Sequence, residues 1–262
     1  MGSFPTVHIV VGSYGNPDSS SCSGSRRLKP GEDLEGLDGK TMNVRGQVAV
    51  MSVNGLLAEL IFDKNPKREF YLEESFPLEW MYPHLEPHGL IMKINRQPLA
   101  ELSDEVVKRD RAYWTHYIQP MIGEWLTYDT PVGEIATFAE KVHVNRDLSG
   151  FRGDPRFVQN EHPQKLFCKL RSSTGGLYSW RGANANSPAE KERMLKEADY
   201  AFRQAFALCP SSAEALFRYI GLLAEQRRLG EAILVAETAV KIKPENLQLP
   251  GWLEQLKRMK QN

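Results

Sequence analysis

From Ser103 to the C-terminus, apolar residues recur at three- and four-residue intervals, the spacing of a helix face that packs on a core. Ser103 followed by two acidic residues is an N-terminal capping pattern, which predicts a helix from residue 103 to about residue 125. Pro120 should kink or break that helix, because proline has no backbone N–H to donate. Thr130 and Pro131 should open a second helix. The polar, Gly-rich stretch 145–154 predicts a loop, and the pattern is helical again after Pro163.

The N-terminal part of the chain has weaker and more mixed patterns. Residues 12–40 are rich in Gly, Ser, Pro and charge, which predicts a flexible lead-in typical of a fragment or a mis-assigned start codon. Residues 44–63 favour a helix, and residues 70–72 and 90–94 favour strands. Between these strands, Pro77 should open a short helix over 78–85. Together these elements predict a small α/β unit.

Four positions recur 34 residues apart near the C-terminus, and this is the length of a tetratricopeptide helix pair. Alanines seven residues apart lie on one helix face and let a neighbouring helix pack close, and a proline just beyond the helix prevents its continuation. A coiled coil or a generic helical bundle would also show helical periodicity, but neither requires this register. The recurring pairs are Glu197 and Glu231, Ala198 and Ala232, Ala205 and Ala239, and Pro210 and Pro244.

The first of the two predicted repeats is longer than the consensus. Gly175, Tyr178 and Gly182 fit its first helix, and Phe202 lies with the recurring alanines on its second. Between these helices, the polar run 183–193 supplies about eleven residues more than a 34-residue unit allows. The second repeat, 213–246, has regular length. A capping helix should follow over 249–260, and the helices at 103–144 should extend the stack, because two repeats are few for a free-standing array.

Composition narrows the possible partners. The chain has 262 residues, 41% of them hydrophobic and 25% charged, which is ordinary for a globular protein. Lys and Arg number 33 and Asp and Glu also number 33, so the net charge of zero argues against a nucleic-acid binder. No apolar run approaches the ~20 residues that span a bilayer, and the run 7–11 is too short for a signal peptide. The chain is therefore expected to be soluble as given.

Three cysteines, Cys22, Cys168 and Cys209, lie far apart and form no CxxC pair, so a zinc ribbon or a thioredoxin-type site is not expected. Cys168 and Cys209 lie among apolar residues and are interpreted as small buried hydrophobic residues. They would pair only if the fold brought them together in an oxidising compartment.

The densest polar cluster lies at residues 70–89. Its two histidines are four residues apart, but Pro87 lies between them and no Glu follows the first, so no metal site and no cofactor are expected. Two of its carboxylates could converge as glycosidic chemistry requires, and its aromatic residues could line a sugar- or peptide-binding surface or form core instead. Arg171 and Arg181 are interpreted as helix surface. The candidate binding residues are Glu74, Glu79, Trp80, Tyr82, His84 and His88.

The segment REFYLEESFPLEWMYPHLEPHGLIMKIN carries a family resemblance. With Phe70-Tyr71, the run 82–85, Gly89-Leu90 and the repeats in that order, the chain resembles the C-terminal part of large bacterial membrane proteins. These are of the glycosyltransferase-C, protein O-mannosyltransferase-like type, and many carry only a domain-of-unknown-function label. The resemblance covers about residues 44–246. It implies membrane attachment, an extracytoplasmic location, and a glycan or lipid-linked sugar bound through a parent protein.

The membrane helices of that family are absent here. Because its catalytic carboxylate lies in an early extramembrane loop, the resemblance implies no catalytic residue in this chain. The predicted fold is mainly α: a flexible lead-in (1–43), a small α/β unit (44–102), a helical linker region (103–160) and a tetratricopeptide-like repeat array with a capping helix (161–262). The predicted function is a non-catalytic scaffold that binds a protein or peptide. The alternative is a glycan-binding or glycosyl-transfer accessory site at 70–89.

Overall fold

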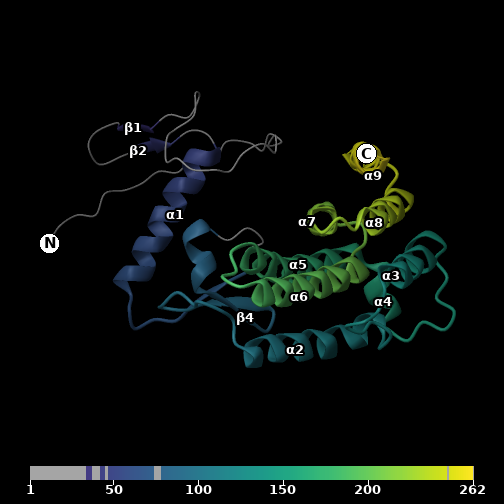
Figure 1. The fold of residues 1–262 in the computed structure, drawn as a ribbon, viewed down its shortest axis with the longest axis horizontal. Coiled ribbons are helices and arrows are strands. Elements are labelled where there is room, and N and C mark those ends of the chain that lie inside the picture. The colour runs from purple at the N-terminus through teal and green to yellow at the C-terminus, as the bar shows by residue number, and fades with distance from the viewer. Residues whose placement is uncertain (1–33, 37–41, 45–46, 74–77, 247, 262) are drawn as a thin grey trace. The chain divides into compact units, whose positions relative to one another are not determined.

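A computed structural model describes residues 34–36, 42–44, 47–73, 78–246 and 248–261 (Figure 1). The chain divides into two compact units, Met1–Arg68 and Glu69–Asn262. The first unit contains an antiparallel pair of short strands, β1 (Leu34–Gly36) and β2 (Met42–Val44), and the helix α1 (Gln47–Lys64). Helix α1 matches the helix predicted over 44–63. Apart from the two strands, the predicted lead-in lies outside the described residues.

The second unit begins with a three-stranded antiparallel sheet in the order β3-β5-β4. Its strands are β3 (Phe70–Leu72), β4 (Leu85–His88) and β5 (Ile91–Ile94), and Leu85 pairs with Ile94. The helix predicted over 78–85 is a 3-10 helix, η1 (Glu79–His84), and Leu85 already belongs to β4. Strand β4 was not predicted, because Pro87 indicates a helix stop. Proline is tolerated there because β4 is an edge strand.

Helix α2 (Asp104–Ile122) begins as predicted, since the Ser103 hydroxyl accepts the Val106 N–H at 3.3 Å. The predicted break at Pro120 is wrong. Pro120 lies in the last turn, and the helix ends two residues later before Gly123, whose φ of +94° few other residues adopt. Helix α3 (Val132–Ala139) continues into a π-helical turn, η2 (Glu140–Val144), and the predicted loop leads to α4 (Pro155–Gln159).

Two helix pairs and a final helix follow. They are α5 (Glu161–Ala183), α6 (Pro188–Leu208), α7 (Ala213–Glu225), α8 (Leu229–Ile242) and α9 (Gln248–Gln261). In Figure 1, α2 lies on one side of the α5–α6 pair, and α7, α8 and α9 follow in order on the other. The first pair has 23 and 21 residues, and the second has 13 and 14. The extra residues of the first repeat therefore lengthen its helices, and the polar run 183–193 is mostly helical.

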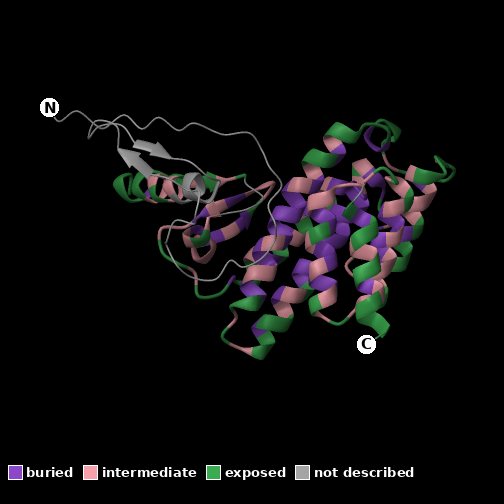
Figure 2. Cartoon of the chain, turned by 90° about the horizontal axis from the view of Figure 1, so that it is seen from above, coloured by how far each residue is buried: buried purple, intermediate pink, exposed green. Residues whose placement is uncertain are grey.

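The 34-residue register is confirmed in the packing. Ala198, Ala205, Ala232 and Ala239 are all fully buried, and each recurring proline, at 210 and 244, follows the end of its helix by two residues. A Cβ on Gly175 would lie 2.8 Å from the ring of Phe202, so the close approach of α5 and α6 requires glycine there. Figure 2 shows the buried residues gathered on the facing sides of these helices.

The long helices of the described ranges bury only part of their surface and carry many charges. Among these residues, no helix combines the length and the apolar character needed to cross a bilayer. Arg171 and Arg181, both predicted on the surface, are buried, so that prediction is wrong.

Candidate functional site

The predicted cluster at 70–89 is spread over several elements. Glu74 lies outside the described residues, and Glu79 is exposed at the start of η1. Trp80 packs edge-on against the ring of His84, with the ring centroids 6.2 Å apart. The Nδ1 atom of His84 lies 2.8 Å from the backbone oxygen of Asn95, and this hydrogen bond holds the ring in place. These contacts fasten η1 to the end of β5.

The two histidines do not share a helical turn. His84 ends η1, whereas His88 is exposed at the end of β4, where its ring packs against Tyr71 at 5.2 Å. Within the described ranges, no group of three His, Cys, Asp or Glu side chains is placed to hold a metal ion.

Tyr82 joins the sheet to the repeats. Its ring stacks on Trp180 of α5 at 5.2 Å, with 19° between the ring planes, and burial raises the pKa of its hydroxyl group. Beside it, Arg181 donates hydrogen bonds to the backbone oxygens of Pro83 at 2.9 Å and Leu99 at 2.6 Å. The predicted candidate Tyr82 thus contacts the helical array through its ring.

A groove of about 750 Å³ runs along α6. One wall is the segment 128–132, which ends at the first residue of α3, and the other is the segment 226–231, which runs from the end of α7 into the first turn of α8. The stripe of α6 that lines it has the three- and four-residue spacing of one helix face. The lining residues are Tyr128, Asp129, Thr130, Pro131, Val132, Pro188, Lys191, Glu192, Leu195, Lys196, Asp199, Arg203, Gln226, Arg228 and Glu231.

The inner end of the groove holds a network of fixed charges. Asp199 forms ion pairs with Arg203 at 2.9 Å and with Arg228 at 2.7 Å, which ties the turn 226–231 to α6. Arg203 also donates to the backbone oxygen of Thr130 at 2.6 Å, and Arg228 pairs with Glu231. Burial lowers the pKa of Arg228, but hydrogen bonds and charge from Glu231 and Asp199 outweigh it, and the net pKa is raised.

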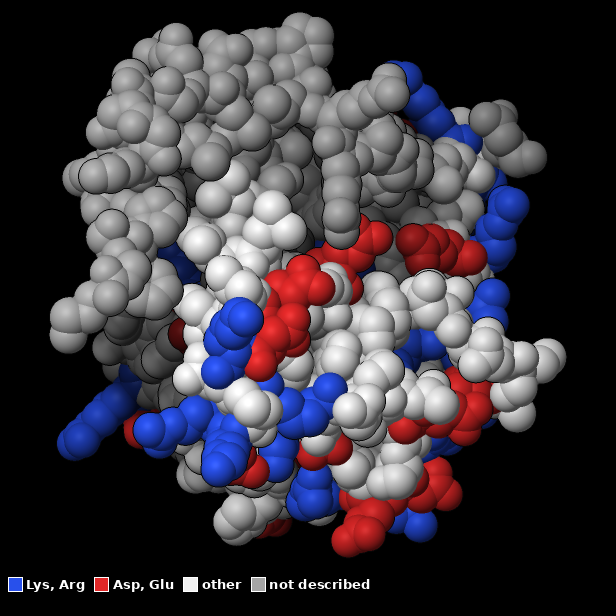
Figure 3. Space-filling view, turned by 90° about the vertical axis from the view of Figure 1, so that its left-hand side faces the viewer, with Lys and Arg blue, Asp and Glu red and all other residues white. Residues whose placement is uncertain are grey.

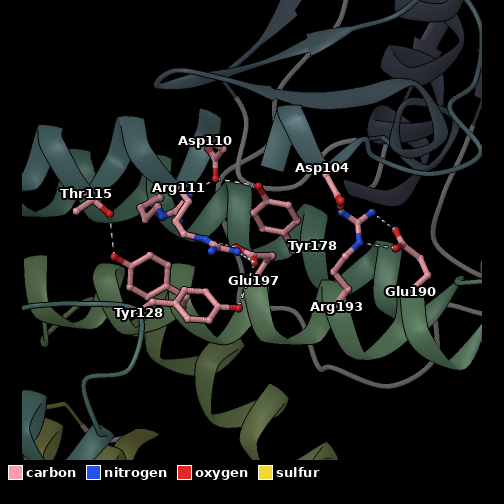
Figure 4. Close-up of polar contacts among 11 residues, drawn as sticks. Asp104, Asp110, Arg111, Thr115, Tyr128, Tyr178, Glu190, Arg193 and Glu197 are labelled. Carbon is pink, nitrogen blue, oxygen red and sulfur yellow. Dashed lines mark hydrogen bonds and ion pairs between the residues drawn. The ribbon is translucent and has the colours of Figure 1, made fainter. Parts of the chain in front are cut away.

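The opposite wall is anchored by the contacts drawn in Figure 4. The guanidinium group of Arg111 on α2 lies 4.1 Å from the ring centre of Tyr128 and pairs with the buried carboxylate of Glu197 on α6. The Tyr128 hydroxyl group donates to the same carboxylate at 3.1 Å. Burial, and then the charge of Glu197, raises the pKa of Tyr128 to about 12, so the hydroxyl group stays a donor.

A further contact keeps this wall in register. The Thr115 and Tyr200 hydroxyl groups lie 2.9 Å apart, and the ring of Tyr200 packs against Tyr128 at 5.0 Å. The groove is therefore bounded by side chains that α2 and α6 hold in place. Pre-positioned side chains of this kind lower the entropic cost of binding.

Sequence reasoning missed the groove, although the sequence contains two signals of it. The polar run interpreted as an insertion contributes Pro188, Lys191 and Glu192 to the lining. The recurrence of Glu197 and Glu231 was interpreted as a helix register, yet both carboxylates bind arginines at the two walls. Neither signal specifies a groove without the long α6 and the segment 128–132 beside it.

Among the described residues, side chains of both charges lie on the surface. On the face shown in Figure 3, basic and acidic side chains alternate, as the zero net charge suggests. A scan against protein-family models and searches of curated proteins and of solved structures all found no match. The resemblance to glycosyltransferase-like membrane proteins therefore stays a prediction.

Proposed function

We propose that this chain is a helical-repeat scaffold that binds an extended segment of a partner protein in the groove along α6. The groove itself carries the proposal: more of its open lining is apolar than polar, charged side chains lie among the apolar ones, and ion pairs anchor its walls. Protein–protein interfaces combine an apolar centre with a polar rim in the same way.

The length of the groove suits a short peptide. Its α6 side runs from Pro188 to Arg203, which corresponds to about 22 Å at 1.5 Å per helical residue. An extended chain rises about 3.3 Å per residue, so roughly seven residues of a partner would fill this length.

The chemistry of the lining specifies the segment further. Leu195 and Pro131 offer apolar surface to anchor one or two hydrophobic side chains of a partner. Lys191 and Asp129 are exposed at the rim, where they would meet charges of opposite sign. A segment with apolar anchors flanked by charged residues fits best.

The first-helix face of the repeats is the usual alternative surface, and it is partly occupied. On α5, Ser172 and Ser173 are buried and Trp180 is stacked against Tyr82. On α7, Phe217 is exposed and packs against Trp252 of α9 at 5.5 Å. Glycan binding at 70–89 and attachment to a membrane-bound parent protein stay predictions.

Selection of displayed peptides, followed by calorimetry, tests the proposal. The intact chain is used to select peptides of random sequence, and the dissociation constant of the best binder is measured. The double charge reversal Asp129→Lys with Lys191→Glu should weaken binding at least about tenfold, equal to about 1.4 kcal/mol, because both rim charges become repulsive.

The matched control reverses two exposed charges away from the groove, with Lys108→Glu on α2 and Glu254→Lys on α9. Both double variants keep the net charge at zero, and the control should bind like the unchanged chain. If no displayed peptide binds, or if the two double variants bind equally well, the proposed function is wrong.

A further inference from the structure

Cys168 and Cys209 meet inside the helical array. Both are free thiols with no exposed surface, although they are 41 residues apart in the chain. The Cys168 thiol donates to the backbone oxygen of Cys209 at 3.9 Å. The fold therefore brings the two cysteines together, which the sequence alone left open.

The pair joins the two helices of the first repeat. Cys168 lies in the first half of α5, and Cys209 is the C-cap of α6, where its N–H donates to the Ala205 oxygen at 3.0 Å. The backbone oxygen of Cys209 accepts the Ser212 N–H at 3.1 Å, at the turn that begins α7. A covalent link here would fasten α5 to the junction between the two repeats.

The two thiols differ in reactivity. The hydrogen bond from Cys168, helped by Ser211, lowers the pKa of Cys209 to about 7, whereas the same pairing and burial raise the pKa of Cys168. The thiol of Cys209 lies 3.5 Å from the hydroxyl oxygen of Ser211. Ser211 is half-buried and lines a second hollow, of about 380 Å³, with Lys165, Lys169 and Lys243. Cys209 is thus the thiol closer to solvent and the better nucleophile.

We propose that Cys168 and Cys209 form a reversible disulfide that locks α5 to the α6–α7 turn. The oxidant is a low-molecular-weight disulfide such as oxidised glutathione. The Cys209 thiolate attacks one of its sulfurs and forms a mixed disulfide, releasing one thiol. Cys168 then loses its proton and attacks the Cys209 sulfur, which breaks the mixed disulfide and releases the second thiol. Two protein thiols are oxidised and one disulfide is reduced to two thiols.

The link would close a long loop and restrict the unfolded chain. Because the bridged residues are 41 positions apart, loop-closure entropy predicts a clear gain in stability. For a chain of this size, the thermal midpoint of the oxidised form should rise by at least about 5 °C.

The test uses the full chain with Cys22→Ser, which removes a cysteine outside the described residues and leaves only the pair. The protein is refolded from urea in a glutathione redox buffer, alkylated, digested without reduction and analysed by mass spectrometry. We expect linked peptides that contain residues 168 and 209, and a raised thermal midpoint that dithiothreitol restores to the reduced value. Thiols that stay alkylatable, glutathione adducts without a linked peptide, or a lowered midpoint would overturn the proposal.

Single-cysteine variants test the order of the two steps. In the Cys22→Ser background, Cys168→Ser leaves Cys209 beside a serine hydroxyl group, which can still donate a hydrogen bond in place of the Cys168 thiol. This Cys209 should form a mixed disulfide with glutathione at least about tenfold faster than Cys168 does in Cys209→Ser. Equal rates would overturn the role of Cys209 as the attacking thiol. Neither measurement uses a binding partner, so the outcome is independent of the proposed binding function.

Discussion

At the scale of single residues, Arg171 illustrates how the array holds charge in its interior. Its guanidinium group is fully buried, donates to Asp110 at 2.9 Å and to Gln204 at 2.7 Å, and lies over the ring of Trp114. The Tyr178 hydroxyl group donates to the same Asp110 carboxylate at 2.9 Å. Buried pairs of this kind cost desolvation energy and define which surfaces of α2, α5 and α6 can meet.

His143, in η2, makes stability depend on pH. Its Nε2 atom is buried without a hydrogen-bond partner among the described residues, and burial lowers the pKa of the imidazole from 6.5 to about 4. The unfolded chain binds a proton at His143 more readily than the folded chain does. The stability of the folded chain that depends on neutral His143 is therefore fully present above pH 6.5 and is lost as the pH falls towards 4. The loss should reach up to about 3 kcal/mol, at 1.36 kcal/mol per unit of pKa.

Urea denaturation of the unchanged chain and of His143→Leu, measured from pH 7 to pH 4, isolates this contribution. As the pH falls, the free energy of unfolding of the unchanged chain should drop relative to that of His143→Leu. A difference that stays constant across this range would show that His143 is not neutral in the folded protein.

At the scale of the elements, the 34-residue register carries the repeat packing. Ala232 is fully buried in α8, where the added volume of leucine has no space. Ala232→Leu should therefore lower the free energy of unfolding by roughly 1–3 kcal/mol. The matched control is Ala112→Leu, because Ala112 is exposed on α2. Denaturant unfolding checks both, and equal stability of the two variants would contradict the register.

Helix periodicity and capping residues were enough to predict most helices of the second unit. Ser103 caps α2, and prolines follow α6 and α8, because these signals act within one turn of the chain. Elements that depend on distant partners were harder to predict. Strand β4 exists through its pairing with β5, and Arg171 is tolerated in the core because Asp110 comes from another helix.

The candidate site depends on distant partners throughout. Its walls come from the segment 128–132 and the turn 226–231, which are far apart in the sequence and meet only across α6. Tyr82, chosen from sequence for its aromatic ring, proved to be a contact between the sheet and α5. Local sequence patterns therefore predicted the helices but not the groove along α6 that we propose as the binding surface.

At the scale of the whole molecule, we propose that the repeats hold the groove along α6 in a form ready to bind a partner segment. Amide hydrogen exchange with and without a selected peptide tests this most directly, since binding slows exchange where backbone segments are held closed. We expect added protection in residues 128–132, 188–203 and 226–231, with little change at 78–89 or along α7. Protection confined to 78–89 or to α7, with none along α6, would contradict it.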